Sequence, residues 1–81
     1  MSKVSLEELQ IRGDNFTTLP KQVGLFNNLM RFNLQGNDLT KLPEEIKKLR
    51  NLKLLNLKFN NFSDEEKARI KKLLPNTEIK F

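Results

Sequence analysis

The stretch "FNLQGNDLTKLP", residues 32–43, decides the fold because it is the middle one of three related stretches in the chain. A related stretch, "LQIRGDNFTTLP", stands earlier at 9–20, and "LNLKFNNF" follows at 55–62. Each copy begins 23 residues after the previous one, since 32 − 9 = 23 and 55 − 32 = 23. Self-similarity at a fixed period of about 20–50 residues is typical of proteins that stack similar coils around one continuous core. The sequence therefore predicts a repeat architecture.

Apolar residues hold the same places in every copy. Counted from Leu6, Leu29 and Leu52, the first, fourth, sixth and eleventh places are apolar, and the ninth is Asp or Asn. The fourth and sixth places are Leu9 and Ile11, Phe32 and Leu34, and Leu55 and Leu57. This alternation predicts a short strand with one face in the core. Successive strands would stack as a parallel sheet with a spacing of about 4.8 Å.

Parallel strands need a return segment between them, and 23 residues leave room for one. Pro20 and Pro43 begin these returns, because proline fixes φ near about −65°. Apolar residues spaced i, i+3 then predict one buried side of a helical turn: Val23 with Phe26, and Ile46 with Leu49. We expect "PEEIKKL" at 43–49 to form a short helix and "PKQVGLF" at 20–26, which contains Gly24, to be more irregular.

The pattern resembles the leucine-rich repeat, L-x-x-L-x-L-x-x-N-x-L, in the 23-residue form that continues with L-P-x-x-I-x-x-L. The resemblance covers residues 6–62, as repeats 6–28, 29–51 and 52–62, and is similar to intracellular-type and bacterial repeat proteins, including those of some spirochaetes. It implies an α/β fold, a short right-handed leucine-rich-repeat solenoid with a parallel sheet on the concave side and short helical turns on the convex side. It also implies a non-catalytic function in protein binding, through the concave face.

The ninth place forms a turn column of Asp14, Asn37 and Asn60. The strand ends there, so buried backbone groups in the turn lose their ladder partners. An Asn side chain both donates and accepts, and it can bridge the backbones of adjacent coils. Asp14 departs from the pattern, because an ionised carboxylate only accepts.

The last segment, "SDEEKARIKKLLPNTEIKF" at 63–81, abandons the repeat and predicts a C-terminal cap. Ser63 and Glu66 fit the S-x-x-E capping box, in which each side chain satisfies a free amide at the helix start. "TEIKF" at 77–81 alternates and predicts a last parallel strand, with Glu78 and Lys80 on its outer face. A solenoid needs such a cover over its last coil. We therefore expect a single domain over 1–81.

The other end differs, because only "MSKVS" at 1–5 precedes the first repeat and predicts no cap. A bare parallel edge is a hazard for unwanted pairing. Three alternatives remain open: a piece of a longer solenoid, a miniature that covers the edge with its own first residues including Val4, or a homodimer. In the last alternative the chain is a self-associating unit whose interface is the edge formed by Leu6, Leu9 and Ile11.

Outward-facing strand residues at the third, fifth and seventh places are the candidate partner-binding surface. They are Glu8, Gln10, Arg12, Arg31, Asn33, Gln35, Leu54, Asn56 and Lys58. Phe59 joins them, because it stands where the other copies have Gly13 and Gly36. Our hypothesis is that Phe59 and Leu54 anchor a protein partner, since aromatic residues are enriched at interface hot spots. The alternative is that Phe59 packs against residues of the terminal strand or against the cap.

This predicted face is only three repeat strands wide, well short of the approximately 800 Å² per partner of a standard interface. Along its middle the side chains of Gln10, Asn33 and Asn56 form a polar row. The row is interpreted either as a ladder of side-chain hydrogen bonds or as a specific reader of the partner.

The composition excludes several classes of site. There is no Cys and no His, so thiolate sites, disulfides and histidine-based catalysis or metal binding are absent. Neither a nucleophile–base pair nor a glycine-rich phosphate loop occurs, and we expect no enzyme activity and no cofactor. No apolar run approaches the roughly 20 residues of a membrane span or forms a signal-peptide core, so we expect a cytoplasmic protein and no membrane partner. A secreted or surface location stays open if the chain is a fragment.

The net charge is +5, from 15 Lys and Arg against 10 Asp and Glu. A third hypothesis is weak nucleic-acid binding through the basic residues Lys47, Lys48, Arg50, Lys71 and Lys72. We do not favour it, because no aromatic residue alternates with these bases as a stacking platform requires. The tripeptide Arg12-Gly13-Asp14 matches an integrin-binding motif, but it lies at a predicted strand end rather than in a flexible loop.

Overall fold

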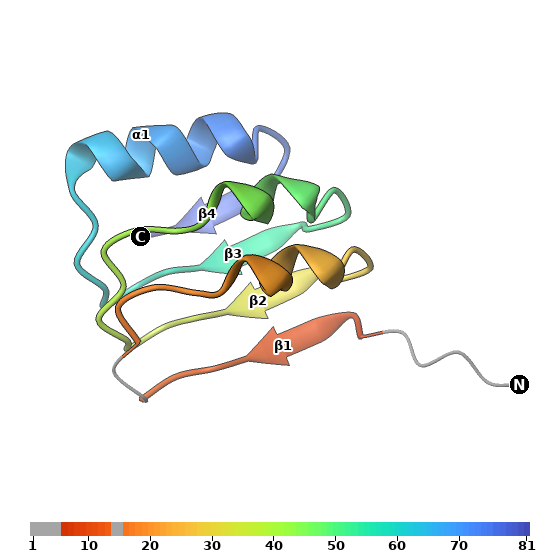
Figure 1. Ribbon diagram of the computed structural model, residues 1–81, viewed down its shortest axis with the longest axis horizontal. Helices are drawn as coiled ribbons and strands as arrows, with labels where there is room; N and C mark the ends of the chain where they lie inside the picture. The colour runs from red at the N-terminus through yellow and green to blue at the C-terminus, as the bar shows by residue number, and fades with distance from the viewer. Residues whose placement is uncertain (1–5, 14–15) are drawn as a thin grey trace, which may run out of the picture.

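A computed structural model describes residues 6–13 and 16–81. In that part of the chain four short strands form one parallel sheet in the order β1-β2-β3-β4 (Figure 1). The strands are β1 (Glu8–Gln10), β2 (Arg31–Asn33), β3 (Leu54–Asn56) and β4 (Glu78–Lys80). Because strand order equals chain order, each return segment leads to the next neighbouring strand. This is the stacked architecture that the 23-residue period predicts.

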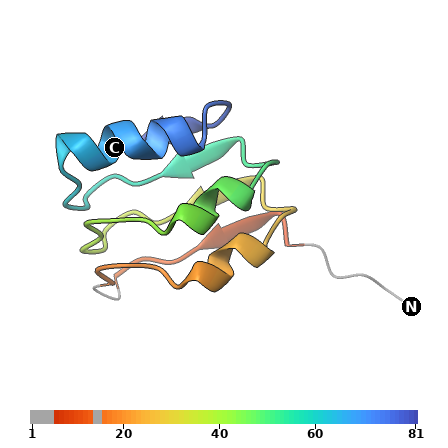
Figure 2. The ribbon, with the colours of Figure 1, turned by 45° about the horizontal axis from the view of Figure 1, so that its top comes forward.

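Helical segments cover one face of this sheet and leave the other open (Figures 1 and 2). They are the 3₁₀ helices η1 (Lys21–Leu25) and η2 (Glu44–Lys48) and the α-helix α1 (Asp64–Leu73). The α/β solenoid with a helical convex side is therefore confirmed. Within the described residues, none of these helices combines the length and apolar character that crossing a bilayer requires.

The core runs along the whole stack between the sheet and the helical segments. Parallel register aligns Leu9, Phe32, Leu55 and Ile79, one from each strand. Phe32 and Leu55 in the interior coils are fully buried, whereas Leu9 and Ile79 at the two ends are only partly covered. Burial thus depends on having a neighbouring coil on both sides, as expected for a one-dimensional stack.

The first two return segments, between β1 and β2 and between β2 and β3, have the same local structure, so the expected contrast between them is wrong. Each is a five-residue 3₁₀ helix that follows a proline in extended conformation. Gly24 does not disorder η1; it allows a close approach to η2. A Cβ at Gly24 would lie 2.9 Å from the backbone oxygen of Glu45, closer than real Cβ contacts allow.

The asparagines of the turn column bridge adjacent coils. Asn37 Nδ2 donates to Ile11 O (2.9 Å) and to Leu34 O (3.1 Å). One coil later, Asn60 Nδ2 donates to Leu34 O (2.9 Å), while its Oδ1 accepts from Leu39 N (3.0 Å). Each side chain therefore satisfies backbone groups of the preceding coil. Asp14, the first member of this column, lies outside the described residues.

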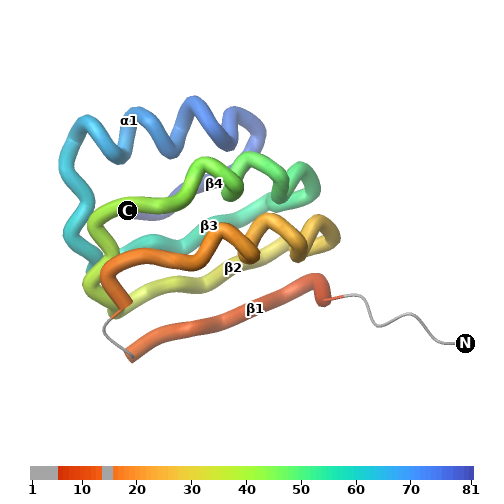
Figure 3. The backbone as a smooth tube through the Cα atoms, viewed as in Figure 1, coloured from red at the N-terminus to blue at the C-terminus, as the bar shows by residue number. Residues whose placement is uncertain are grey.

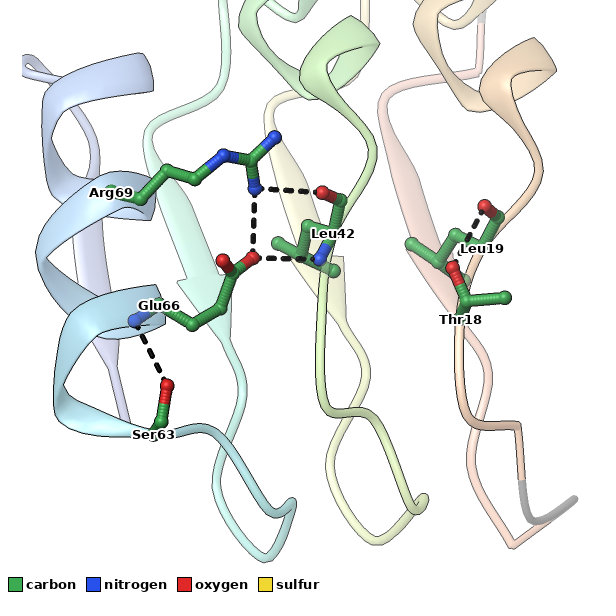
Figure 4. Close-up of polar contacts among 6 residues, drawn as sticks. All are labelled: Thr18, Leu19, Leu42, Ser63, Glu66 and Arg69. Carbon is green, nitrogen blue, oxygen red and sulfur yellow. Dashed lines mark hydrogen bonds and ion pairs between the residues drawn. The ribbon is translucent and has the colours of Figure 1, made fainter.

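Of the two hydrogen bonds in the capping box predicted for α1, one is present and the other is not. Ser63 Oγ accepts a hydrogen bond from Glu66 N (3.1 Å), as the motif requires. The Glu66 carboxylate does not return to Ser63; it accepts from Leu42 N (3.0 Å) and from Arg69 Nη1 (2.8 Å) (Figure 4). Arg69 Nη1 also donates to Leu42 O (2.9 Å). The nearly buried carboxylate thus fastens the cap helix to the preceding coil, a partner that local sequence does not reveal.

The C-terminal end of the stack is closed by the cap. Phe62 and Phe81 pack edge to face with ring centroids 6.1 Å apart. Lys67 Nζ and Lys71 Nζ lie 5.6 Å and 5.8 Å from the centre of the Phe81 ring. In the same cap, Thr77 Oγ1 donates to Leu52 O (2.8 Å) and ties the start of β4 to the third coil.

Candidate functional site

The open face of the sheet carries the outward side chains in aligned columns. The columns are Glu8, Arg31, Leu54 and Glu78 at the strand starts; Gln10, Asn33, Asn56 and Lys80; and Arg12, Gln35 and Lys58 at the strand ends. We call these side chains, with Phe59, the concave face. The sequence-based set lacked Glu78 and Lys80, although the alternation in "TEIKF" had placed them on the outer side of a last strand. The face is therefore four strands wide, not three.

The polar row in the middle is not a simple ladder from strand to strand. Asn33 Oδ1 accepts from the backbone N–H of Gln35 (3.0 Å), and Asn56 Oδ1 accepts from that of Lys58 (3.1 Å). Asn56 Nδ2 donates diagonally to Gln35 Oε1 (3.0 Å). Asn and Asp side chains commonly bond to their own backbone two residues ahead in this way. The amides of Asn33 and Asn56 are thus oriented by backbone contacts within their own strands.

A shallow hollow of about 110 Å³ lies at the strand starts. It is lined by Glu8, Arg31, Phe32, Asn33, Leu54 and Asn56. Small-molecule sites usually measure about 300–1,000 Å³, so this hollow suits a single side chain rather than a metabolite. Leu54 is its half-buried apolar member, and the exposed ion pair of Arg31 with Glu8 (3.3 Å) forms its rim.

Phe59 stands out at the far end of β3. Its side chain is 74% exposed, and its backbone φ is 60°. The counterparts Gly13 and Gly36 have φ values of 80° and 76°, which glycine adopts without strain. A residue with a Cβ adopts that conformation at a cost of about 1–2 kcal/mol. The alternative that Phe59 packs against the terminal strand or the cap is wrong, because its side chain is largely exposed, and Phe62 packs against Phe81 there instead.

A second surface lies at the N-terminal end of the stack, where, among residues 6–13 and 16–81, β1 has a neighbouring strand on one side only (Figure 3). An apolar groove of about 410 Å³ opens there, lined by Leu9, Ile11, Leu19, Pro20, Gln22, Val23, Leu25, Phe26 and Phe32. We call it the open-end groove. Five large apolar residues of the described chain are exposed, and four belong to this first coil: Leu6, Phe16, Leu25 and Phe26.

Of the edge residues predicted from the sequence, Leu9 and Ile11 line this groove and Leu6 is exposed, whereas the lining residues Leu25 and Phe26 were not in the predicted set. Phe26 was expected to be buried with Val23, yet it is 40% exposed because no described coil covers it. Leu25 is 76% exposed. The signal for Leu25 was its counterpart 23 residues later, Lys48, which shows that the place faces solvent.

Two of the basic residues proposed for nucleic-acid binding have contacts within the chain. Lys47 Nζ pairs with Glu44 Oε1 (3.0 Å), and Lys71 lies over the Phe81 ring. The hydrogen bond and charge of Lys47 hold the pKa of Glu44 below its usual value. Among residues 6–13 and 16–81, no cluster of three or more His, Cys, Asp or Glu side chains could hold a metal ion.

The repeated coil, the asparagine column and the open concave face agree with a comparison to protein families. The family model of the leucine rich repeat matches residues 4–62, well over half of the chain. The chain belongs to the leucine-rich repeat family. Proteins of this family typically bind other proteins and are generally non-catalytic.

Among solved structures, this leucine-rich repeat chain is similar to the LRR protein LIC12759 of Leptospira interrogans. The TM-score is 0.86 at 44% sequence identity, over 89% of this chain and 18% of that chain. The chain thus spans about a fifth of that protein's length. No curated protein gave a significant sequence match.

Proposed function

We propose that this leucine-rich repeat chain is a non-catalytic protein-binding module and that the concave face is its binding surface. The observation that carries the proposal is Phe59, an exposed aromatic side chain on a backbone conformation that favours glycine. The residue buries little apolar surface within the chain, so it adds little to folding. Buried in a partner, the same ring would supply the contact area typical of a hot spot.

Leu54 supplies a second anchor on the same strand line. Phe59 stands five positions after Leu54, which corresponds to at most roughly 16 Å of extended chain. A partner segment that runs along β3 would reach the Leu54 hollow with one side chain and Phe59 with another. Between these anchors lie the oriented amide of Asn56 and the exposed ammonium of Lys58.

The charges at the strand ends favour a partner with acidic groups. Arg12, Lys58 and Lys80 are exposed, and the ion pairs of the described residues involve none of them. Complementary charge steers association and selects against wrong partners more than it adds affinity. We therefore expect the partner segment to combine an apolar anchor with one or more carboxylates.

Selection of peptides from a random display library against the wild-type chain tests this function. Selected peptides should lose at least about tenfold in affinity for the double variant Phe59→Ala, Leu54→Ala, because truncation of a hot-spot residue costs about 2 kcal/mol or more. The matched control is Lys72→Ala, an exposed position on α1, which should bind like the wild type. Circular dichroism establishes that both variants fold. Unchanged affinity in the folded double variant would remove the proposal.

Self-association through the open-end groove is a second candidate function. The observation in its favour is the apolar groove at this end of the sheet, in which Leu25 and Phe26 are exposed. Sedimentation of the chain across a range of concentrations should give twice the monomer mass at high concentration, and Leu9→Lys should restore the monomer. A monomer mass at every concentration would exclude this candidate.

A further inference from the structure

We propose that a second copy of the chain closes the open-end groove through antiparallel pairing of the two β1 strands around a twofold axis at Gln10. In this arrangement Gln10 faces Gln10 of the second copy, and Glu8 faces Arg12 of the second copy. The proposal rests on the second candidate function above and specifies its geometry. Three features carry it: the edge of β1, the apolar side of the first coil, and the charges along the strand.

The unpaired edge belongs to the even-numbered residues of β1. On the side of β2, Glu7 O accepts from Arg31 N (3.0 Å), and Ile11 N donates to Asn33 O (2.9 Å). Alternate residues of a parallel strand bond to the same neighbour. The backbone groups of Glu8, Gln10 and Arg12 therefore face the open edge. Such an edge is a template for another strand.

The apolar side of the first coil needs a partner with the same pattern. Phe32 and Leu34 are fully buried because the first coil lies against them, whereas their counterparts Leu9 and Ile11 are half-buried. A twofold axis at Gln10 sets Leu9 beside Ile11 of the second copy, on the core side of the sheet. The exposed Leu25 would then lie in the seam between the two convex sides.

The charges select one register among those possible. Pairing that keeps the even-numbered backbone groups in hydrogen bonds can set Glu8 opposite Glu8, Gln10 or Arg12 of the second copy. Only the last register places opposite charges face to face, and symmetry makes that contact twice. Opposite charges directly across an antiparallel pair stabilise it, and like charges destabilise it. Arg12 is exposed and takes part in none of the ion pairs of the described chain.

The resulting dimer is closed. A twofold interface uses the same patch on both copies, so it satisfies both open ends at once. The opposite ends carry the α1 cap with its Phe62–Phe81 contact. The two four-stranded sheets become one continuous sheet, and the two concave faces become one surface of twice the width. A surface of twice the width comes closer to the area per partner that a standard protein interface buries.

A cysteine scan tests the register, and the chain contains no native Cys to interfere. Gln10→Cys faces itself across the axis at about 5.5 Å between Cα atoms, within the range of a disulfide. Mild oxidation should link it into covalent dimers. Asn33→Cys, the same place one strand inward, is the matched control and should stay monomeric under denaturing conditions. Equal cross-linking of the two variants would indicate random collision and overturn the register.

A charge exchange gives an independent test. Glu8→Arg and Arg12→Glu should each weaken the dimer several-fold in sedimentation equilibrium, and the double exchange should restore it. Leu25→Lys should also weaken the dimer without loss of fold, because Leu25 is largely exposed in one copy. A wild-type chain that stays monomeric overturns both this geometry and self-association. A stable dimer in which the double exchange fails to restore pairing overturns the geometry alone.

Discussion

Phe59 carries the functional argument at the scale of a single residue. Its φ of 60° matches the glycine conformations of the two other coils, and its ring is exposed. We predict that Phe59→Gly leaves the free energy of unfolding unchanged or raises it by about 1 kcal/mol, because relief of strain exceeds the entropy that glycine loses on folding. Urea denaturation measures this. A loss above about 1 kcal/mol would mean that the ring supports the fold.

Glu66 is the residue that fastens the cap. We predict that Glu66→Ala lowers the free energy of unfolding by about 2–3 kcal/mol, because Leu42 N loses its acceptor in a buried place. Ser63→Ala should cost about 1 kcal/mol, the usual value for an N-cap. Equal effects of the two substitutions would show that Glu66 acts only as part of the helix start.

Glu44 gives a small dependence of stability on pH. Its pKa lies below the usual 4.5 in the folded chain because of the hydrogen bond and charge of Lys47. A depressed pKa stabilises the folded state above the unfolded pKa, and this contribution is lost as pH falls through the folded value. Glu44→Gln should therefore be slightly less stable than the wild type at pH 7 and equal to it at low pH. Thermal melts of both chains along a pH series measure this difference. A difference in melting temperature that does not shrink as the pH falls would contradict the prediction.

At the scale of elements, η1 and η2 depend on the absence of a side chain at Gly24. We predict that Gly24→Ala lowers the free energy of unfolding by about 1–3 kcal/mol, because a Cβ would overlap the backbone of Glu45. Gln22→Ala, an exposed change in the same 3₁₀ helix, is the control and should be nearly neutral. The same melting temperature for the two variants would contradict the close contact.

The helices and strands could be predicted from the sequence where residues close together in the chain determine them. Alternation over Leu9 and Ile11 and its repeats placed the strands and their buried face, because a period of two needs no distant partner. The similarity of η1 and η2 could not be predicted, since it depends on a contact between coils. The carboxylate of Glu66 was assigned to its own helix for the same reason. It found a backbone partner 24 residues away.

The candidate site shows the same limit. The outward columns follow from the alternation along each strand, so the predicted set contained their members on β1, β2 and β3 but not Glu78 and Lys80 on β4. The sequence could not predict whether Phe59 is exposed or packed, because an apolar residue is compatible with either environment. The groove members Leu25 and Phe26 were missed since their exposure depends on which coils are present beside them.

At the scale of the whole molecule, the described residues form a solenoid with one capped end, one end at which β1 has no further described strand beside it, and one free face of the sheet. The closed end uses α1 and two aromatic rings, and the open end leaves apolar residues exposed. The free face combines two apolar anchors with oriented amides and basic groups. The cap stabilises the closed end, and our proposals place self-association at the open end and partner binding on the concave face.

The most direct test of the binding function is calorimetric titration of a selected peptide into the wild-type chain and into Phe59→Gly. Because the glycine variant keeps the fold and its backbone conformation, any loss of affinity comes from the missing ring. We predict that its unfolding free energy is unchanged or higher while its affinity falls by at least about tenfold. Equal affinity of the two chains would contradict a binding surface centred on Phe59.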